Sequence, residues 1–216
     1  LDLYLQNIRN ILISLSDRID EEALADPEAL QRLLQERTGG NSGIVSYLYV
    51  QRRDGTIVSS DQLMYGIVGH PGLPEMFRIA DEYPGVVNWS ELYYSPLLTD
   101  RTVAFVLTLK NGAGTVLAEI NTSQLTRRLY ELLSSGQGFA LFTGQGNIVS
   151  YDPYSRIVPF KPATLPPEMD DRFAQELTSL PNGVSRIDGV NGPLMVVKSE
   201  RNELGWYLVT LTDERD

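Results

Sequence analysis

The chain has 216 residues, of which 42% are hydrophobic and 21% charged, as in an ordinary globular protein. At about 150 residues per domain, this length allows one large domain or two small ones. The net charge of −10 argues against a nucleic-acid partner, because phosphate binding needs a basic surface. There is no cysteine, and the single histidine, His70, lies in a glycine- and proline-rich turn sequence. We therefore expect no catalytic residue, no metal site and no cofactor.

The first 43 residues predict a helical lead. Apolar residues recur at spacings of three and four, which places them on one side of a helix: Leu1, Leu5, Ile8, Leu12, Leu15 and Ile19. Asp26 and Pro27 then predict the start of a second helix, with Asp26 as N-cap and Pro27 in the first turn. Gly39 and Gly40 should end it.

Residues 44–122 have the character of β-structure. Runs of β-branched and aromatic residues at 44–50 and 56–58 flank Asp54-Gly55, which predicts a β-hairpin. Further strands are expected at 103–109 and 115–120. The stretch 61–100 is rich in glycine and proline with a short helix near 75–81, and a connection this long is usually functional.

A helix should follow at 123–136, capped by Ser123, and the rest of the chain then repeats the first module. Gly55–Asp61 matches Gly146–Asp152 at five of seven positions, at an offset of 91 residues. The same offset places Gly114 on Gly205 and Ile120 on Leu211. Two blocks with one offset predict two tandem α+β modules, at 44–122 and 137–216, each an antiparallel sheet flanked by helices.

Several segments, in this order after a long N-terminal helix, resemble the double Cache family: Tyr49–Val58, Trp89–Pro96, Gly114–Ile120, Phe139–Phe142, Gly146–Val149 and Gly205–Val209. This family comprises extracytoplasmic sensor domains whose modules are PAS-like in fold. The resemblance implies a ligand-binding, membrane-distal module at 44–122 and a membrane-proximal module at 137–216. It also implies flanking membrane helices outside this segment, which fits a chain that begins at Leu1 and contains no run of 18 apolar residues.

In function, the resemblance implies the periplasmic portion of an inner-membrane receptor that senses a small molecule. The output of such receptors is most often a histidine kinase, with chemoreceptors, cyclic-dinucleotide enzymes and phosphatases as alternatives. A second hypothesis is an interaction module without a small ligand, which forms a homodimer through the apolar stripe of the first helix or pairs with a periplasmic binding protein. An enzyme is a third and disfavoured hypothesis.

The first module offers the candidate ligand contacts. Arg78 could hold a carboxylate bidentately, and its alternative is an ion pair with Asp81 or Glu82. The aromatic residues of the long connection, Tyr65, Trp89 and Tyr93, could line a pocket or pack in the core. Tyr47 and Tyr49 share one strand face, which lines the pocket or covers the N-terminal helix.

Glu119 is a candidate by the resemblance. It lies where amino-acid-binding members of the family carry an aspartate that holds the ammonium group of the ligand. Two departures argue against an α-amino acid: the glutamate is one methylene longer, and Arg78 is followed by Ile79 and Ala80 instead of two aromatic residues. The alternatives that remain are a carboxylate, another small polar metabolite, and an empty pocket.

Overall fold

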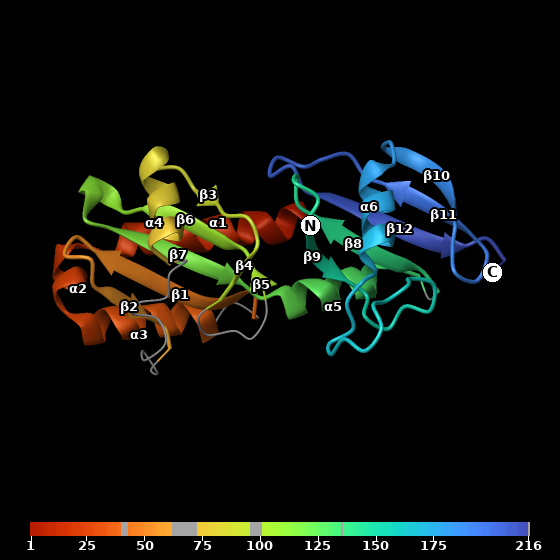
Figure 1. The fold of residues 1–216 in the computed structure, drawn as a ribbon. Helices are drawn as coiled ribbons and strands as arrows, with labels where there is room; N and C mark the ends of the chain where they lie inside the picture. The colour runs from red at the N-terminus through yellow and green to blue at the C-terminus, as the bar shows by residue number, and fades with distance from the viewer. Residues whose placement is uncertain (40–42, 62–72, 96–100, 135, 216) are drawn as a thin grey trace. The chain divides into compact units, whose positions relative to one another are not determined.

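Two five-stranded antiparallel sheets organise the chain, one in each of two units, Leu1–Asn121 and Thr122–Asp216 (Figure 1). The computed structural model describes residues 1–39, 43–61, 73–95, 101–134 and 136–215. No helix within these ranges is long and apolar enough to cross a membrane.

The helical lead forms three helices of the first unit: α1 (Asp2–Arg18), α2 (Glu21–Ala25) and α3 (Pro27–Gly39). The predicted N-cap is present, since the Asp26 carboxylate accepts hydrogen bonds from the backbone N–H groups of Glu28 and Ala29, both at 3.1 Å. α2 was not predicted, because five residues are too short to establish a period.

The apolar stripe of α1 is part of the core of the first unit. Its buried members include Leu5, Ile8, Leu12 and Leu15, each no more than 1% exposed. Because the stripe packs within the unit, it cannot also form the dimer seam that the sequence suggested. A homodimer through the N-terminal helix stays a prediction.

The sheet of the first unit has the strand order β2-β1-β7-β6-β3, and a short two-stranded sheet, β4-β5, accompanies it. The predicted hairpin corresponds to β1 and β2, and the predicted helix near 75–81 corresponds to α4. In chain order the elements are β1 (Val45–Arg52), β2 (Ile57–Ser59), α4 (Leu73–Glu82), β3 (Asn88–Trp89), β4 (Tyr93–Tyr94), β5 (Arg101–Thr102), β6 (Ala104–Thr108) and β7 (Gly114–Ile120).

Helices contact both faces of this sheet. α4 covers one face, where its Phe77 and Ala80 pack against Tyr49, Val106 and Leu117. The alternate residues of the same strands point the opposite way, toward the face contacted by α1 and α3. In Figure 1, α1 lies behind the sheet and α4 in front of it. Each strand therefore divides its side chains between two different cores.

The second unit has the equivalent strand order, β9-β8-β12-β11-β10. Asp170 caps α6 by accepting a hydrogen bond from the Phe173 N–H at 3.0 Å. The helix expected at 123–136 begins at Thr122, so Ser123 lies inside its first turn. The elements are α5 (Thr122–Leu132), β8 (Gly138–Phe142), β9 (Ile148–Tyr151), α6 (Asp171–Ser179), β10 (Gly183–Asp188), β11 (Pro193–Lys198) and β12 (Tyr207–Asp213).

The repeat is present in the topology, with one correction to its register. Tyr49 lies opposite Leu117, and Ala140, 91 residues after Tyr49, lies opposite Val209. The last strand is therefore offset by 92 residues and not by 91. Because a shift of one residue moves a side chain to the other face, Leu211 occupies the position of Glu119 and not that of Ile120.

Candidate functional site

The carboxylate of Glu119 is fully buried on the α4 face of the first sheet. Glu119 in β7 has no exposed surface. Its Oε1 accepts a hydrogen bond from the Tyr93 hydroxyl at 2.6 Å, and its Oε2 accepts from the hydroxyls of Ser95 at 2.7 Å and Tyr49 at 3.1 Å. Buried charge is tolerated only where it is paired or hydrogen-bonded, and here three hydroxyl groups perform that role.

The residues of this cluster come from three segments of the chain, at β1, β4 and β7. β1 supplies Tyr47, directly opposite Glu119 in the ladder, and Tyr49 two residues further along on the same face. The rings of the two tyrosines have centroids 6.5 Å apart and are tilted by 41°. Tyr93 comes from β4, and Ser95 follows that strand directly. The result is a carboxylate surrounded by aromatic rings and hydroxyl donors.

Burial sets the acid–base properties of the cluster. It raises the pKa of the Glu119 carboxyl, while the hydrogen bonds from Tyr93, Ser95 and Tyr49 act in the opposite direction. The pKa values of the Tyr49 and Tyr93 phenols are also raised, first by burial and then by the nearby Glu119 charge. The phenols therefore keep their protons and act as donors. Among the described residues, burial and these three hydroxyl groups account for the shift in the pKa of Glu119.

The cluster unites four of the candidates named from the sequence: Glu119, Tyr47, Tyr49 and Tyr93. The two tyrosines of β1 lie on the α4 face beside Glu119 and do not cover the N-terminal helix, while their contact with a ligand stays a prediction. Sequence reasoning missed Ser95, because a serine before a proline carries no signal that distinguishes it from an ordinary loop residue. Tyr65 lies outside the described residues.

Arg78 is not brought to the cluster. It occupies the outer side of α4, where its side chain is 56% exposed. Its guanidinium donates to Glu75 at 2.6 and 2.9 Å and to Glu82 at 2.7 Å. The ion pair that the sequence offered as the alternative is therefore the one that forms, with Glu82 as named, but with Glu75 in place of Asp81.

Trp89 also lies away from the cluster. In the ladder it is opposite Phe105, whereas Glu119 is opposite Ala104. Neighbouring positions of a strand face opposite sides, so Trp89 shares the face of Phe105 and not that of Glu119. Trp89 is half-buried and does not contribute to the cluster around Glu119.

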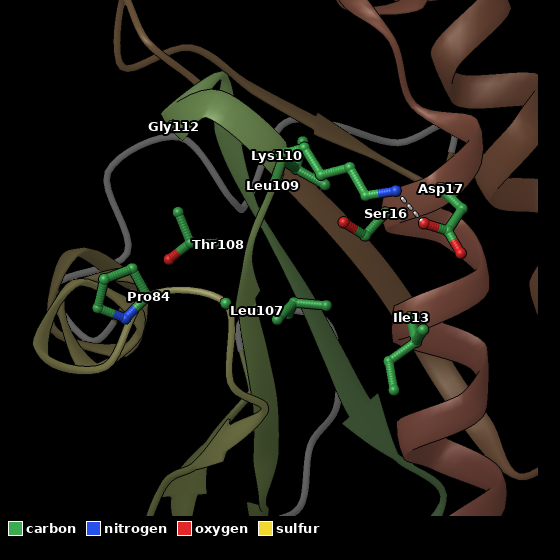
Figure 2. A pocket seen from close by; sticks show the side chains of 10 residues that line it. Ile13, Ser16, Asp17, Pro84, Leu107, Thr108, Leu109, Lys110 and Gly112 are labelled. Carbon is green, nitrogen blue, oxygen red and sulfur yellow. Dashed lines mark hydrogen bonds and ion pairs between the residues drawn. The ribbon is translucent and has the colours of Figure 1, made fainter.

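A hollow of about 500 Å³ lies elsewhere in the first unit, between α1 and the end of β6. Ile13, Leu107 and Leu109 line it, and Figure 2 shows Lys110 reaching toward Asp17 of α1. The two charged side chains form an ion pair but remain 70% and 55% exposed. Exposed pairs of this kind contribute little energy, and the charges satisfy each other. The Glu119 cluster, with its buried charge, is the better candidate for a site.

The second unit has no counterpart of the cluster at the equivalent positions. Gly138, Ala140 and Leu211 occupy the places of Tyr47, Tyr49 and Glu119. These positions belong to or adjoin an apolar core in which α6 supplies Phe173 and Leu177. The polar cluster is therefore a property of the first unit.

The fold is that of known sensor domains. Over 98% of this chain and 88% of the other, it matches the ligand-binding domain of the Pseudomonas aeruginosa amino-acid chemoreceptor PctB in complex with L-Arg, with a TM-score of 0.71 and 18% identity. The ligand-binding domain of the chemoreceptor PctC from the same organism, in complex with GABA, matches over 97% of this chain and 92% of its own, with a TM-score of 0.69 and 15% identity.

The extracellular domain of a candidate histidine kinase matches as well, over 98% of this chain and 88% of its own, with a TM-score of 0.70 and 12% identity. No family model and no curated protein matches the chain. Identities this low establish the fold alone, and the predicted α+β fold of two tandem modules is confirmed.

Proposed function

We propose that the chain is the extracytoplasmic ligand-sensing domain of a membrane-bound signalling receptor, and that the Glu119 cluster is its ligand-contacting site. The buried Glu119 carboxylate and its three hydroxyl donors carry the proposal. A cluster that only stabilised the fold would be replaceable by apolar residues, as at the equivalent positions of the second unit.

Ligand binding would act by a shift in population between two conformations. A ligand that contacts both the sheet and the segment of Tyr93 and Ser95 would favour the conformation in which the two lie close together. α1 and the last strand, β12, would pass the displacement to flanking membrane helices. The output would be a histidine kinase or a chemoreceptor, since domains of both kinds share this fold. A reading frame with apolar spans of about 20 residues on both sides of this segment would support the receptor assignment.

Thermal denaturation in the presence of small metabolites tests the site. The panel contains amines, amino acids, carboxylates, sugars and nucleosides. We expect at least one compound to raise the melting temperature of the wild-type chain and to have no effect on Glu119→Gln. The control is Glu22→Gln, which removes the same charge from an exposed position in α2 and should respond like the wild type.

Two results would count against the proposal. One is a panel in which no compound stabilises the wild-type chain. The other is a stabilising compound that acts equally on the wild type and on Glu119→Gln, which would place the ligand elsewhere. The hollow beside Lys110 is then the next candidate.

A further inference from the structure

We propose that the open edge of β10 in the second unit pairs antiparallel with β10 of a second copy of this chain, so that two five-stranded sheets join into one. In this pairing, Arg186 of each copy lies opposite Asp188 of the other. The inference goes beyond the proposed function, because it concerns neither a ligand nor the Glu119 cluster.

β10 forms one edge of the second sheet (Figure 1). All six of its residues pair with β11, and among the described residues no other strand pairs with it. In the turn that follows, the Gly189 N–H donates to the Gly192 carbonyl at 2.8 Å. Hydrogen-bonded and non-hydrogen-bonded pairs alternate from that bond. The backbone N–H and C=O groups of Val184, Arg186 and Asp188 therefore point away from β11, toward the open edge.

This edge has few of the features that keep strand edges apart. Short edge strands, bulges, prolines and lysines usually protect an open edge. β10 contains neither proline nor lysine, and its ladder with β11 runs without a register shift. The outer surface of the two strands is also apolar, since Val184 is 71% exposed and Met195 and Val197 beside it are exposed as well. Such an edge is a template for a further strand.

The alternation of faces limits how two β10 strands can pair. Val184, Arg186 and Asp188 are exposed on the outer face, whereas Ile187 is buried on the inner face. Residues directly opposite each other must share a face, so a symmetric pairing centres on Ser185, Arg186 or Ile187. A centre at Arg186 would place two guanidinium groups opposite each other, which is destabilising.

A centre at Ile187 brings opposite charges together. It places Arg186 of each copy opposite Asp188 of the other, and this combination occurs twice because of the symmetry. Val184 then faces Val190, whose side chain is exposed in the turn after β10. A centre at Ser185 would instead place Arg186 opposite Val184, with no charge pair. Charge complementarity therefore selects the register centred on Ile187.

Both charged side chains are available for this contact. Asp188 is exposed, and its carboxylate has no hydrogen bond or ion pair with any other described residue. Arg186 pairs with Glu214 of its own chain, but its side chain remains 69% exposed. A guanidinium group has five N–H donors, so it can hold a second carboxylate. The partner that fits this edge is thus a second copy of the chain.

Sedimentation equilibrium tests the proposal. Because a single strand edge is a small interface, the concentrations should extend from micromolar to about 1 mM. We expect the wild-type chain to show a monomer–dimer equilibrium. Arg186→Asp and Asp188→Arg should each lower the association constant about tenfold or more, because each turns both charge pairs into like-charge pairs. An equimolar mixture of the two variants restores the opposite charges and should associate again.

Two further variants check the charge effect and the register. Arg172→Asp reverses the same charge on an exposed residue of α6 and should leave association unchanged. The chain has no cysteine, so a single introduced thiol reports its own neighbour. Ile187→Cys should form a disulfide-linked dimer under mild oxidation, since the two thiols lie directly opposite each other. Ser185→Cys, which marks the alternative register, should cross-link far less. Circular dichroism confirms that each variant is folded.

The proposal is overturned if the wild-type chain is monomeric at every concentration. It is also overturned if both charge reversals leave the dimer intact, or if mixing the two variants fails to restore it. Equal cross-linking of Ile187→Cys and Ser185→Cys would contradict the register. None of these outcomes affects the stabilisation of the wild-type chain by a small molecule, so the ligand-sensing proposal stands or falls separately.

Discussion

The hydroxyl of Tyr93 donates to Oε1 of Glu119 over 2.6 Å, although the two residues are 26 positions apart in the sequence. The bond joins the β4–β5 ribbon to the central sheet of the first unit. It satisfies one oxygen of a carboxylate that has no exposed surface. Removing it would test how far the cluster holds these segments together.

Tyr93→Phe should lower the free energy of unfolding by about 1–3 kcal/mol, because it leaves one buried carboxylate oxygen without this donor. Urea denaturation measures the change. Tyr94→Phe is the matched control, since Tyr94 is the next residue and is 64% exposed. Equal effects of the two substitutions would mean that the hydrogen bond contributes nothing.

Stability should fall as the pH rises through the ionisation of Glu119. Its pKa is raised in the folded state by burial, so between the ordinary pKa of 4.5 and the raised value the folded chain holds more protons than the unfolded chain. Glu119→Gln removes this contribution. The difference in unfolding free energy between the variant and the wild type, measured from pH 4 to pH 8, should therefore shift in favour of the variant as the pH rises. A difference independent of pH would contradict a raised pKa.

In the second unit, Lys198→Met should lower the free energy of unfolding by about 2 kcal/mol, because charge-assisted hydrogen bonds are lost. Lys198 is 7% exposed, and its ammonium donates to the carbonyl oxygens of Thr178 and Leu180 at 2.7 and 2.8 Å, at the end of α6. The ammonium also lies 4.5 Å from the centre of the Tyr207 ring.

Lys161→Met is the control for this prediction. Lys161 forms its ion pairs with Glu168 and Asp171 near the surface, and its loss should leave the unfolding midpoint unchanged. If Lys198→Met also left the midpoint unchanged, the hydrogen bonds from the ammonium to the carbonyl groups at the end of α6 would contribute nothing to stability.

Gly114→Ala should destabilise the first sheet by about 1–3 kcal/mol through overpacking. A Cβ atom at this position would lie 2.5 Å from the carbonyl oxygen of Gln51, which belongs to the neighbouring strand and cannot move aside alone. Gly144→Ala is the comparison, since its Cβ would come no closer than 3.3 Å to another atom. Its cost in urea denaturation should be less than about 1 kcal/mol. Equal costs would show that the strands can separate at Gly114.

By itself, the sequence determined the local structure and the repeat. The 3–4 spacing of apolar residues in α1, the cap at Asp26 and the turn at Asp54-Gly55 each depend on a few neighbouring residues, so their signals are local. The repeat emerged because two blocks shared one offset. α2 was not predicted, because its five residues are too few to show a helical period.

Only the tertiary structure decided which side chains meet. The register of β12, shifted by one residue, placed Leu211 at the position of Glu119, so the equivalent position of the second unit is apolar. The same rule of alternation turned Trp89 away from the site, and the helical position of Arg78 turned its guanidinium toward Glu75 and Glu82. Ser95 joined Glu119 only because the chain returns across the sheet. Residue type predicts which chemistry is available, but the face of a strand or helix decides where it acts, and long-range packing sets that face.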